Sequence, residues 1–365
     1  MNIFEEYLDK IKSLIYKNKN LLNLDTLNNF KGITVETPPS EYNFDLSCNA
    51  GLVLGKINKI NPKELAQKIK DLILKDLKDF ENIEIAGAGF LNMKLSKKRI
   101  ISNIKKILQN KDTFGKKKSN NTYNIEFVSA NPTGPMHVGH CRGAIFGDVL
   151  SNLLKFNGNN IVKEYYINDY GNQIKNFVKS VFLRIREIKY NEKFISHEDL
   201  YPGDYIIDIS EKIIKLNEKE KFSSLEECYE LVKKESLKIS MELIKSDLRM
   251  LGIEHNNFFS EAELVKNKLV EKAVDRLKKK KFVLQGYLEP PKGNLDKKWK
   301  KTKRLIFKST LFGDDTDRAL QKNDGSWTYF ANDVGYHMDK VNRKFDYLIN
   351  VLGADHTGYV KRITA

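Results

Sequence analysis

The sequence predicts an α/β protein in which a small N-terminal α/β unit precedes a larger domain built on a parallel sheet. A chain of 365 residues is longer than one compact core ordinarily holds, so more than one domain is expected. Helical and strand-like apolar spacing alternate along the chain, and a strand, a loop, a helix and a second strand succeed one another over 123–168. That succession indicates neighbouring parallel strands joined by a crossover helix.

The first unit is expected over residues 1–115. Its clearest helix is NPKELAQKIKDLILKDLKDF (61–80), whose apolar stripe comprises Leu65, Ile69, Leu72, Ile73 and Leu77. IEIAGAGFLNMKL then alternates like a pair of strands, and KKRIISNIKKILQN has the spacing of a further helix. The polar, glycine-containing stretch at 112–121 marks the boundary.

The second unit is expected over residues 116–365. Its predicted elements, in order, are a strand at 123–128, a helix at about 137–156, a strand at 161–168, helices over 172–250, hairpins and loops at 283–309, a helix at about 331–342 and a strand at 346–353. Residues near 190–300 would form a mainly helical insertion.

Composition excludes several classes of protein. Hydrophobic residues make up 41% and charged residues 30%, which is typical of a globular protein, and no apolar run approaches the ~18 residues of a membrane span. Three distant cysteines without CxxC spacing, and an N-terminus without a signal-peptide core, indicate the cytoplasm. The net charge of +15 favours a nucleic-acid partner, although generic solvated lysines would give the same balance.

The stretch VSANPTGPMHVGHCRGAIFGD (128–148) carries the strongest chemical signal. Prolines and glycines turn the chain after a predicted strand, and the start of the following helix offers free backbone N–H groups to an anion. His137 and His140 stand three apart and would project from one face of the first turn, while Gly139 would let a ligand approach the backbone. A nucleotide triphosphate suits this arrangement.

Two other interpretations of this stretch stay open on spacing alone. The histidines could be purely structural, or HxxH with Cys141 could bind a metal. No HExxH spacing and no second Cys/His cluster accompanies them, so no metal site is predicted.

The surroundings of HVGH resemble the arginyl-tRNA synthetase family, of bacterial type. HVGH itself is similar to the HIGH signature of class I aminoacyl-tRNA synthetases. The blocks that carry the closer resemblance occur in one order along almost the whole chain: AGAGFLNMKL (86–95), EFVSANPTGPMHVGH (126–140), YYINDYGNQI (165–174), YPGDYI (201–206), FGDDTDRAL (312–320), DGSWTYFANDVGYHMDK (324–340) and VLGADHTGYVKR (351–362).

The resemblance implies site residues that spacing could not assign. For arginine it implies Ser129, Asn131, His140, Tyr329 and Asp333, with Glu126 as a second acidic candidate. A guanidinium has a rigid fork of donors that a carboxylate accepts in parallel, so a pocket built on Asp333 would reject lysine and neutral amino acids. On residue pattern alone, Asp333 could instead cap a helix or form a surface ion pair.

For ATP the resemblance implies His137, Gly139, His140, Gly353, Asp355 and His356. His137 and His140 would be the catalytic pair that stabilises charge at the α-phosphate. The last three follow the final predicted strand, where an Asx turn before Gly358 is the alternative.

The implied fold is a class I synthetase Rossmann-like parallel-sheet catalytic domain after an N-terminal domain that contacts tRNA. The implied reaction is ATP-dependent activation of L-arginine, assisted by Mg²⁺, followed by transfer to tRNA(Arg). We expect a cytoplasmic, monomeric protein without a membrane partner.

The sequence departs from the family pattern in two ways. The family continues through a KMSKS-type loop and a helical anticodon-binding domain, whereas the lysine-rich segments at 278–281 and 297–304 stand in the wrong context for that loop. Members without the KMSKS lysine carry a compensating lysine at the position that Gly134 occupies here. We therefore expect a truncated product, a fragment or half of a split enzyme, and the activity of this chain alone is open.

Two alternatives belong to other functional classes. One is a non-catalytic, synthetase-derived fragment that binds tRNA or arginine. The other is an unrelated nucleotidyltransferase that shares HxGH, but the approach to His137 lacks the Phe-Asp pair of that group.

Overall fold

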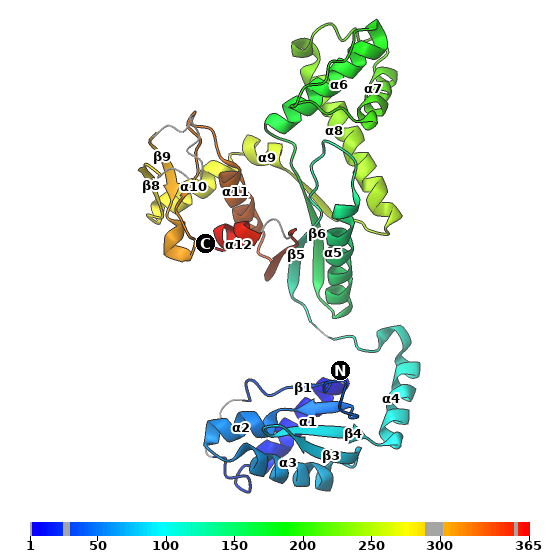
Figure 1. Ribbon diagram of the computed structural model, residues 1–365, viewed down its shortest axis with the longest axis vertical. Coiled ribbons are helices and arrows are strands. Elements are labelled where there is room, and N and C mark those ends of the chain that lie inside the picture. The colour runs from blue at the N-terminus through cyan, green and yellow to red at the C-terminus, as the bar shows by residue number, and fades with distance from the viewer. Residues whose placement is uncertain (1, 25–29, 118, 289–301, 354–356) are drawn as a thin grey trace. The chain divides into compact units, whose positions relative to one another are not determined.

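The structure, a computed structural model, describes residues 2–24, 30–117, 119–288, 302–353 and 357–365. The chain divides into two compact units, Met1–Lys118 and Ser119–Ala365 (Figure 1). Each unit has its own core and is described by itself.

The first unit is an antiparallel sheet of order β1-β2-β4-β3 with helices against it. Its elements are α1 (Ile3–Lys17), β1 (Val35–Glu36), β2 (Leu46–Cys48), α2 (Ala50–Asn58), α3 (Pro62–Asp76), β3 (Phe80–Ala86), β4 (Phe90–Leu95) and α4 (Lys97–Asn110). The predicted strand pair and the helix after it are confirmed, because β3 and β4 pair in antiparallel fashion and α4 follows.

The helix predicted over 61–80 is too long. α3 ends at Asp76, and Leu77 has extended backbone angles (φ −114°, ψ 95°) that lead the chain into β3. Leu77 still packs against the core of this unit, so the apolar periodicity of the sequence continues beyond the end of the helix. Apolar spacing reports which side chains face the core and cannot by itself locate a helix end.

The second unit is built on a sheet of order β11-β5-β6-β7 in which every pair of neighbouring strands is parallel. Its strands are β5 (Thr122–Glu126), β6 (Asn160–Ile167), β7 (Asn257–Ser260) and β11 (Tyr347–Asn350). Helix α5 (Val138–Phe156) connects β5 to β6, which confirms the predicted strand-helix-strand unit and its parallel sheet.

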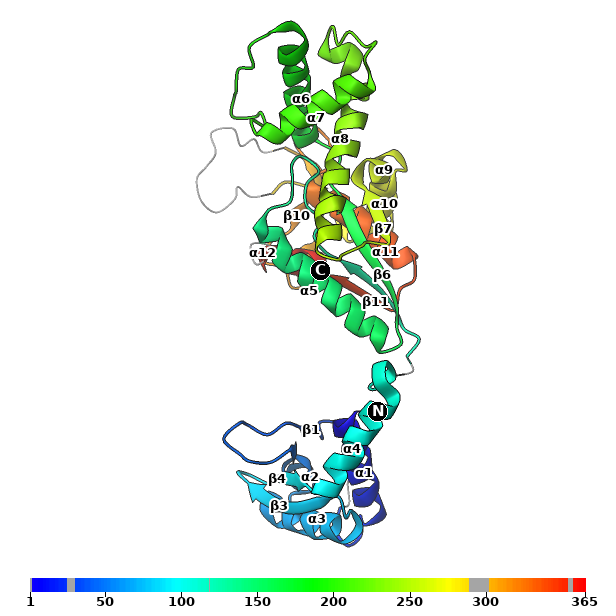
Figure 2. The ribbon, with the colours of Figure 1, turned by 90° about the vertical axis from the view of Figure 1, so that its right-hand side faces the viewer.

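Helices cover both faces of this sheet. On one face α5 packs with the end of α8 (Leu225–Met250), and their buried residues meet Ile125 and Tyr165 of the strands. On the other face lies α11 (Tyr329–Asn342), as Figure 2 shows. Its Tyr336 ring packs against Tyr166 of β6. Alternate strand residues therefore face different helices, as the period of two in a strand requires.

The remaining elements extend the second unit. α6 (Asn172–Tyr190), α7 (Asp204–Leu216) and α8 share an apolar core and form the helical insertion. They are followed by α9 (Glu261–Lys266), α10 (Leu269–Lys279), β8 (Val283–Gly286), β9 (Arg304–Phe307), β10 (Arg318–Ala319) and α12 (Thr357–Thr364). The predicted insertion near 190–300 is thus helical as far as α10. Its later part contains β8, which forms a small antiparallel sheet with β9 and β10.

Within the described ranges, no helix has both the length and the apolar character needed to cross a bilayer.

Candidate active site

The loop after β5 bends sharply at two consecutive residues. Val128 (φ +69°) and Ser129 (φ +42°) both adopt left-handed backbone angles, which are uncommon for residues other than glycine and strained for a β-branched one. The bend places the Ser129 hydroxyl over β6, where it accepts a hydrogen bond from the Tyr166 backbone N–H (3.0 Å) and donates one to Oε1 of Glu126 (3.1 Å). Local strain of this kind is a mark of functional sites.

Both signature histidines cap the helix that they introduce. His137 is the N-cap residue of α5, and its Nδ1 accepts a hydrogen bond from the Gly139 N–H (3.2 Å). Nδ1 of His140 accepts one from the His137 N–H (3.3 Å), and the two rings stack with centroids 3.8 Å apart. An imidazole whose Nδ1 accepts a hydrogen bond carries its proton on Nε2 when it is neutral.

The Nε2–H groups of His137 and His140 are therefore the side-chain donors that this helix start can offer to a ligand. Burial, and then the neighbouring His137, lowers the pKa of His140, which keeps that ring neutral at physiological pH. The prediction that both histidines lie together at the start of one helix is confirmed, because their rings stack there. The prediction that backbone N–H groups of this helix start are free for an anion is wrong for His137 and Gly139, whose N–H groups donate to the imidazoles.

Gly139 has a role within the protein. A Cβ at this position would lie 3.0 Å from Nδ1 of His137, so the missing side chain makes room for the capping imidazole. Gly147 allows a second close approach in the same helix, because a Cβ there would lie 2.3 Å from the Phe127 ring. Gly147 therefore lets α5 pack closely against Phe127, just after the end of β5.

The helical insertion also contacts this loop. Tyr205 of α7 donates a hydrogen bond from its hydroxyl to the Thr133 carbonyl (2.9 Å). A Cβ at Gly134 would lie 3.2 Å from that hydroxyl oxygen, so a larger residue at this position would have to displace Tyr205. Asn131, a predicted arginine ligand, is held by the Asn168 side-chain amide (3.0 Å).

Helix α11 presents the residues predicted for the guanidinium. Thr328 is its N-cap, so Tyr329 opens the helix and Asp333 follows one turn later on the same side. The interpretation of Asp333 as a helix cap is thereby wrong. Oδ2 of Asp333 accepts a hydrogen bond from the Tyr359 hydroxyl, and burial, followed by the charge of Asp333, raises the pKa of that tyrosine.

A cavity of about 460 Å³ lies beside the start of α11, within the roughly 300–1,000 Å³ of small-molecule sites. Its lining includes Gly171 at the start of α6, Trp327 in the loop before α11, Glu261 at the start of α9, and Tyr329 and Asn332 of α11. Tyr329 is 59% exposed, so its ring forms part of the open wall.

Glu261 is the functional candidate that the sequence analysis missed. The residue is 2% exposed, its Oε1 accepts a hydrogen bond from the Asn332 amide (2.7 Å), and its Oε2 has no partner among the described residues. Burial, together with the charges of Asp333 and Asp169, raises its pKa to about 7. A buried carboxyl group that repels neighbouring carboxylates favours a bound cation.

A signal for Glu261 was present in the sequence. The residue directly follows the aromatic strand β7, and ligands of parallel sheets bind at the carboxyl ends of strands. The four half-buried residues of β7 show no clear alternation, so the sequence pattern does not predict this strand or the site at its end.

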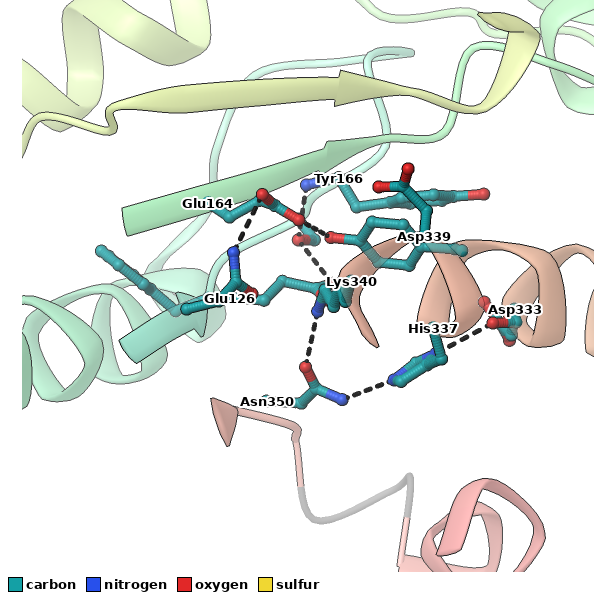
Figure 3. Close-up of polar contacts among 12 residues, drawn as sticks. Glu126, Glu164, Tyr166, Asp333, His337, Asp339, Lys340 and Asn350 are labelled. Atoms are coloured by element: carbon teal, nitrogen blue, oxygen red, sulfur yellow. Dashed lines mark hydrogen bonds and ion pairs between the residues drawn. The ribbon is translucent and has the colours of Figure 1, made fainter. Parts of the chain in front are cut away.

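Glu126 has a cationic partner inside the protein. Its Oε2 lies 2.5 Å from Nζ of Lys340, a side chain that is completely buried (Figure 3). The negative charge of Glu126 is therefore already balanced by Lys340. Its predicted contact with arginine stays a prediction.

The predicted ATP residues after β11 are only partly described. Gly353 is exposed, whereas Asp355 and His356 lie outside the described residues. Among the described residues, no group of three or more His, Cys, Asp and Glu side chains could hold a metal ion.

Known proteins match both units of the chain. The family model for the catalytic domain of "tRNA synthetases class I (R)" matches residues 103–365, and the model for the arginyl tRNA synthetase N-terminal domain matches residues 5–95. An arginine–tRNA ligase of Pelagibacter ubique is 51% identical over 368 residues, which cover all of this chain and 64% of that protein. One of Bartonella henselae is 44% identical over 377 residues, which cover all of this chain and 63% of that protein.

A solved structure shares the fold. The arginyl-tRNA synthetase of Plasmodium falciparum is 19% identical, covers 97% of this chain and 60% of its own, and has a TM-score of 0.64. The chain thus spans slightly less than two thirds of the length of these relatives. A family model that covers most of the sequence, close relatives and a common fold lead to one conclusion: this chain belongs to the arginyl group of class I tRNA synthetases.

Proposed function

We propose that this chain forms the N-terminal domain and most of the catalytic domain of an arginine–tRNA ligase. The enzyme would activate L-arginine with ATP to give arginyl-adenylate and pyrophosphate, and would then transfer arginine to tRNA(Arg). The observation that carries the proposal is the buried carboxyl group of Glu261, beside Asp333, at a cavity of suitable size and without a cationic partner among the described residues.

The guanidinium of arginine would provide the missing positive charge. Its planar fork donates parallel hydrogen bonds to carboxylates and remains charged at any physiological pH, whereas a lysine ammonium cannot form the fork. A bound guanidinium would also relieve the repulsion between the carboxylates, so Glu261 would lose its proton when arginine binds. Tyr329 would close one wall of this end of the site.

At the other end, His137 and His140 would act on ATP. Both rings direct Nε2–H donors away from the backbone atoms that hold Nδ1, and the positive end of the α5 dipole lies at the same place. These groups would stabilise the charge that develops on the α-phosphate when the arginine carboxylate attacks it in line. Ser129 and Asn131 would orient the arginine backbone groups for that attack.

Mg²⁺ would arrive with ATP. Mg²⁺ in such sites is held largely by phosphate oxygens and water, with one or two protein carboxylates. No step of the proposal depends on a protein site for this ion.

The proposed partners are tRNA(Arg), L-arginine and ATP, and the proposed state is a cytoplasmic monomer. The net charge of +15 favours contact with the tRNA backbone. The three free cysteines agree with a reducing compartment.

Amino-acid-dependent exchange of pyrophosphate into ATP tests the proposal. The assay uses the chain completed with the C-terminal region that its relatives carry, in the presence of tRNA(Arg), and supplies each amino acid in turn. Exchange should require arginine. Exchange with another amino acid would refute the assignment, and arginine binding without exchange in the completed protein would identify a non-catalytic binding protein.

A further inference from the structure

One buried ammonium group joins three elements behind the proposed arginine site. Nζ of Lys340, on α11, donates to Oε2 of Glu126 at the end of β5 (2.5 Å) and to Oδ1 of Asn350 at the end of β11 (2.8 Å), as Figure 3 shows. Glu126 and Asn350 are register partners in these parallel strands. The ammonium also lies 4.4 Å from the centre of the Tyr336 ring, so each of its directions of donation faces a partner.

The hydrogen bonds beyond Lys340 can run in only one direction. Because Asn350 Oδ1 accepts from the ammonium, its amide nitrogen points toward Nε2 of His337 (2.8 Å) and donates to it. Nδ1 of His337 must then carry the ring proton, which it donates to the Asp333 carbonyl (2.9 Å). Burial, and then the charge of Lys340, lowers the pKa of His337 and keeps the ring neutral.

The other branch leads to the bent loop. Oε1 of Glu126 accepts a hydrogen bond from Ser129 (3.1 Å), whose left-handed backbone conformation needs such support. Ser129 precedes Asn131 and the histidine signature, whereas Asp333 belongs to the opposite end of the proposed site. Two hydrogen bonds therefore link Lys340 to Ser129 through Glu126. Three link it to Asp333 through Asn350 and His337.

We propose that Lys340 is a positioning residue that sets the relative placement of the Ser129 loop and the Asp333 turn without touching the substrate. This inference rests on the proposed function. Lys340 also neutralises Glu126, so the negative charge that attracts the arginine side chain is concentrated on Glu261 and Asp333. The hydrogen bonds from Lys340 to Asn350 and from Asn350 to His337 fix the tautomer of His337. That tautomer can be observed by NMR spectroscopy.

The first test removes the ammonium and keeps a similar side-chain volume. In the completed enzyme, Lys340→Met should raise the KM for arginine at least about tenfold, since small displacements of binding groups weaken positioning, while the KM for ATP changes less than about twofold. Lys340→Arg, which keeps the charge, should restore part of the loss.

Lys163 provides a matched control. Lys163 lies on β6 of the same unit. Its ammonium likewise donates to one carboxylate and one asparagine, Oδ1 of Asp148 (2.6 Å) and Oδ1 of Asn152 (3.2 Å), and both partners belong to α5. Lys163→Met should leave the KM for arginine unchanged. Equal effects of Lys163→Met and Lys340→Met would show a general loss of stability and would overturn the positioning role.

The second test reads the histidine tautomer in this chain without any activity assay. Long-range ¹H–¹⁵N spectra of protein labelled in its histidine side chains should show His337, assigned with His337→Gln, neutral and protonated on Nδ1. Asn350→Asp keeps the shape of the side chain but replaces the donor amide with an acceptor, so His337 should become protonated on both nitrogens at neutral pH.

The outcomes separate the two proposals. A wild-type His337 protonated on Nε2, or an unchanged spectrum in Asn350→Asp, would overturn the proposed hydrogen-bond chain even if Lys340→Met failed to fold. A completed wild-type enzyme that does not use arginine would instead sink the proposed function and leave the tautomer measurement intact.

Discussion

The chemistry of single residues depends on which of their atoms are already engaged. His137 and His140 each hold a backbone N–H on Nδ1, which leaves Nε2–H as the donor toward a ligand. HxxH spacing predicts two imidazoles on one helix start, but it gives neither the stacking of the rings nor the tautomer. The tautomer follows from the backbone N–H groups that each Nδ1 accepts, and the stacking from the positions of the two rings in the folded chain.

At this scale we expect His140→Ala to impair the chemical step. Loss of one preorganised donor costs on the order of 10²–10³ in kcat, and the same change leaves the His137 N–H without its acceptor. Pyrophosphate exchange in the completed enzyme measures the effect. His197→Ala, at an exposed position in the insertion, is the control and should retain wild-type exchange. Equal kcat values for the two variants would remove His140 from the mechanism.

Residue types alone could not rank the acidic candidates. Glu126 and Asp333 were predicted through the family resemblance, whereas Glu261 emerged only from its burial and its position after β7. The two glutamates differ in their partners. Glu126 pairs with Lys340, which lies 214 positions away in the sequence, and no local pattern encodes such a contact.

The strands and helices were predicted more accurately than the contacts between them. Apolar periodicity located α5, β6 and α11 to within two residues, because the cores impose that periodicity directly. It extended α3 too far because Leu77 remains in the core after the helix ends. It missed β7, a strand of four half-buried residues that alternate too little to be recognised.

The glycines of α5 give a prediction at the scale of elements. Gly147→Ala would drive a methyl group into the Phe127 ring and should destabilise the second unit by about 1–3 kcal/mol. Gly143→Ala, in the same helix with open space around it, should stabilise it by up to about 1 kcal/mol through helix propensity.

Urea unfolding followed by tryptophan fluorescence measures both changes. Trp327 lies in the loop before α11, and residues 1–118 contain no tryptophan, so the signal reports on the second unit even if the first unfolds separately. Equal midpoints for the two variants would show that α5 does not need its close approach to β5.

At the scale of the whole second unit, a buried carboxylate ties α11 to the sheet. Glu164 of β6 is fully buried and accepts hydrogen bonds from Arg343 (2.5 and 2.8 Å) and Tyr336 (2.6 Å). Burial would raise the pKa of Glu164, but the hydrogen bonds from Arg343, Tyr336 and Asn257 outweigh it and lower the pKa from 4.5 to about 2.

This arrangement predicts acid sensitivity of the second unit. Because the folded pKa of Glu164 lies below its unfolded value, its contribution is present above pH 4.5 and is lost as the pH falls toward 2. A difference of this size corresponds to about 3 kcal/mol. Urea midpoints of the wild-type protein, measured from pH 7 to pH 2, should fall across this window. Glu164→Gln should have a lower midpoint at pH 7, and its midpoint should change less with pH in the same window. A parallel fall in the variant would assign the acid sensitivity to other groups.

The whole molecule combines a fold that could be predicted with a site that could be predicted only in part. The α/β class and the parallel sheet followed from periodicity, and the family resemblance predicted roles for the histidines and Asp333 that stay predictions. The ion pairs and the cavity beside α11 depend on contacts between distant segments, which only the folded chain brings together.

The central claim is that a guanidinium binds between the buried carboxyl group of Glu261 and the partly buried one of Asp333. Calorimetric titration of this chain with L-arginine, L-citrulline and L-lysine tests it most directly, because citrulline keeps the shape of arginine and lacks its charge. We predict that arginine binds, that citrulline and lysine bind at least about a hundredfold more weakly, and that Asp333→Asn and Glu261→Gln each weaken arginine binding. Citrulline binding as tightly as arginine, or arginine affinity unchanged in both variants, would contradict the account.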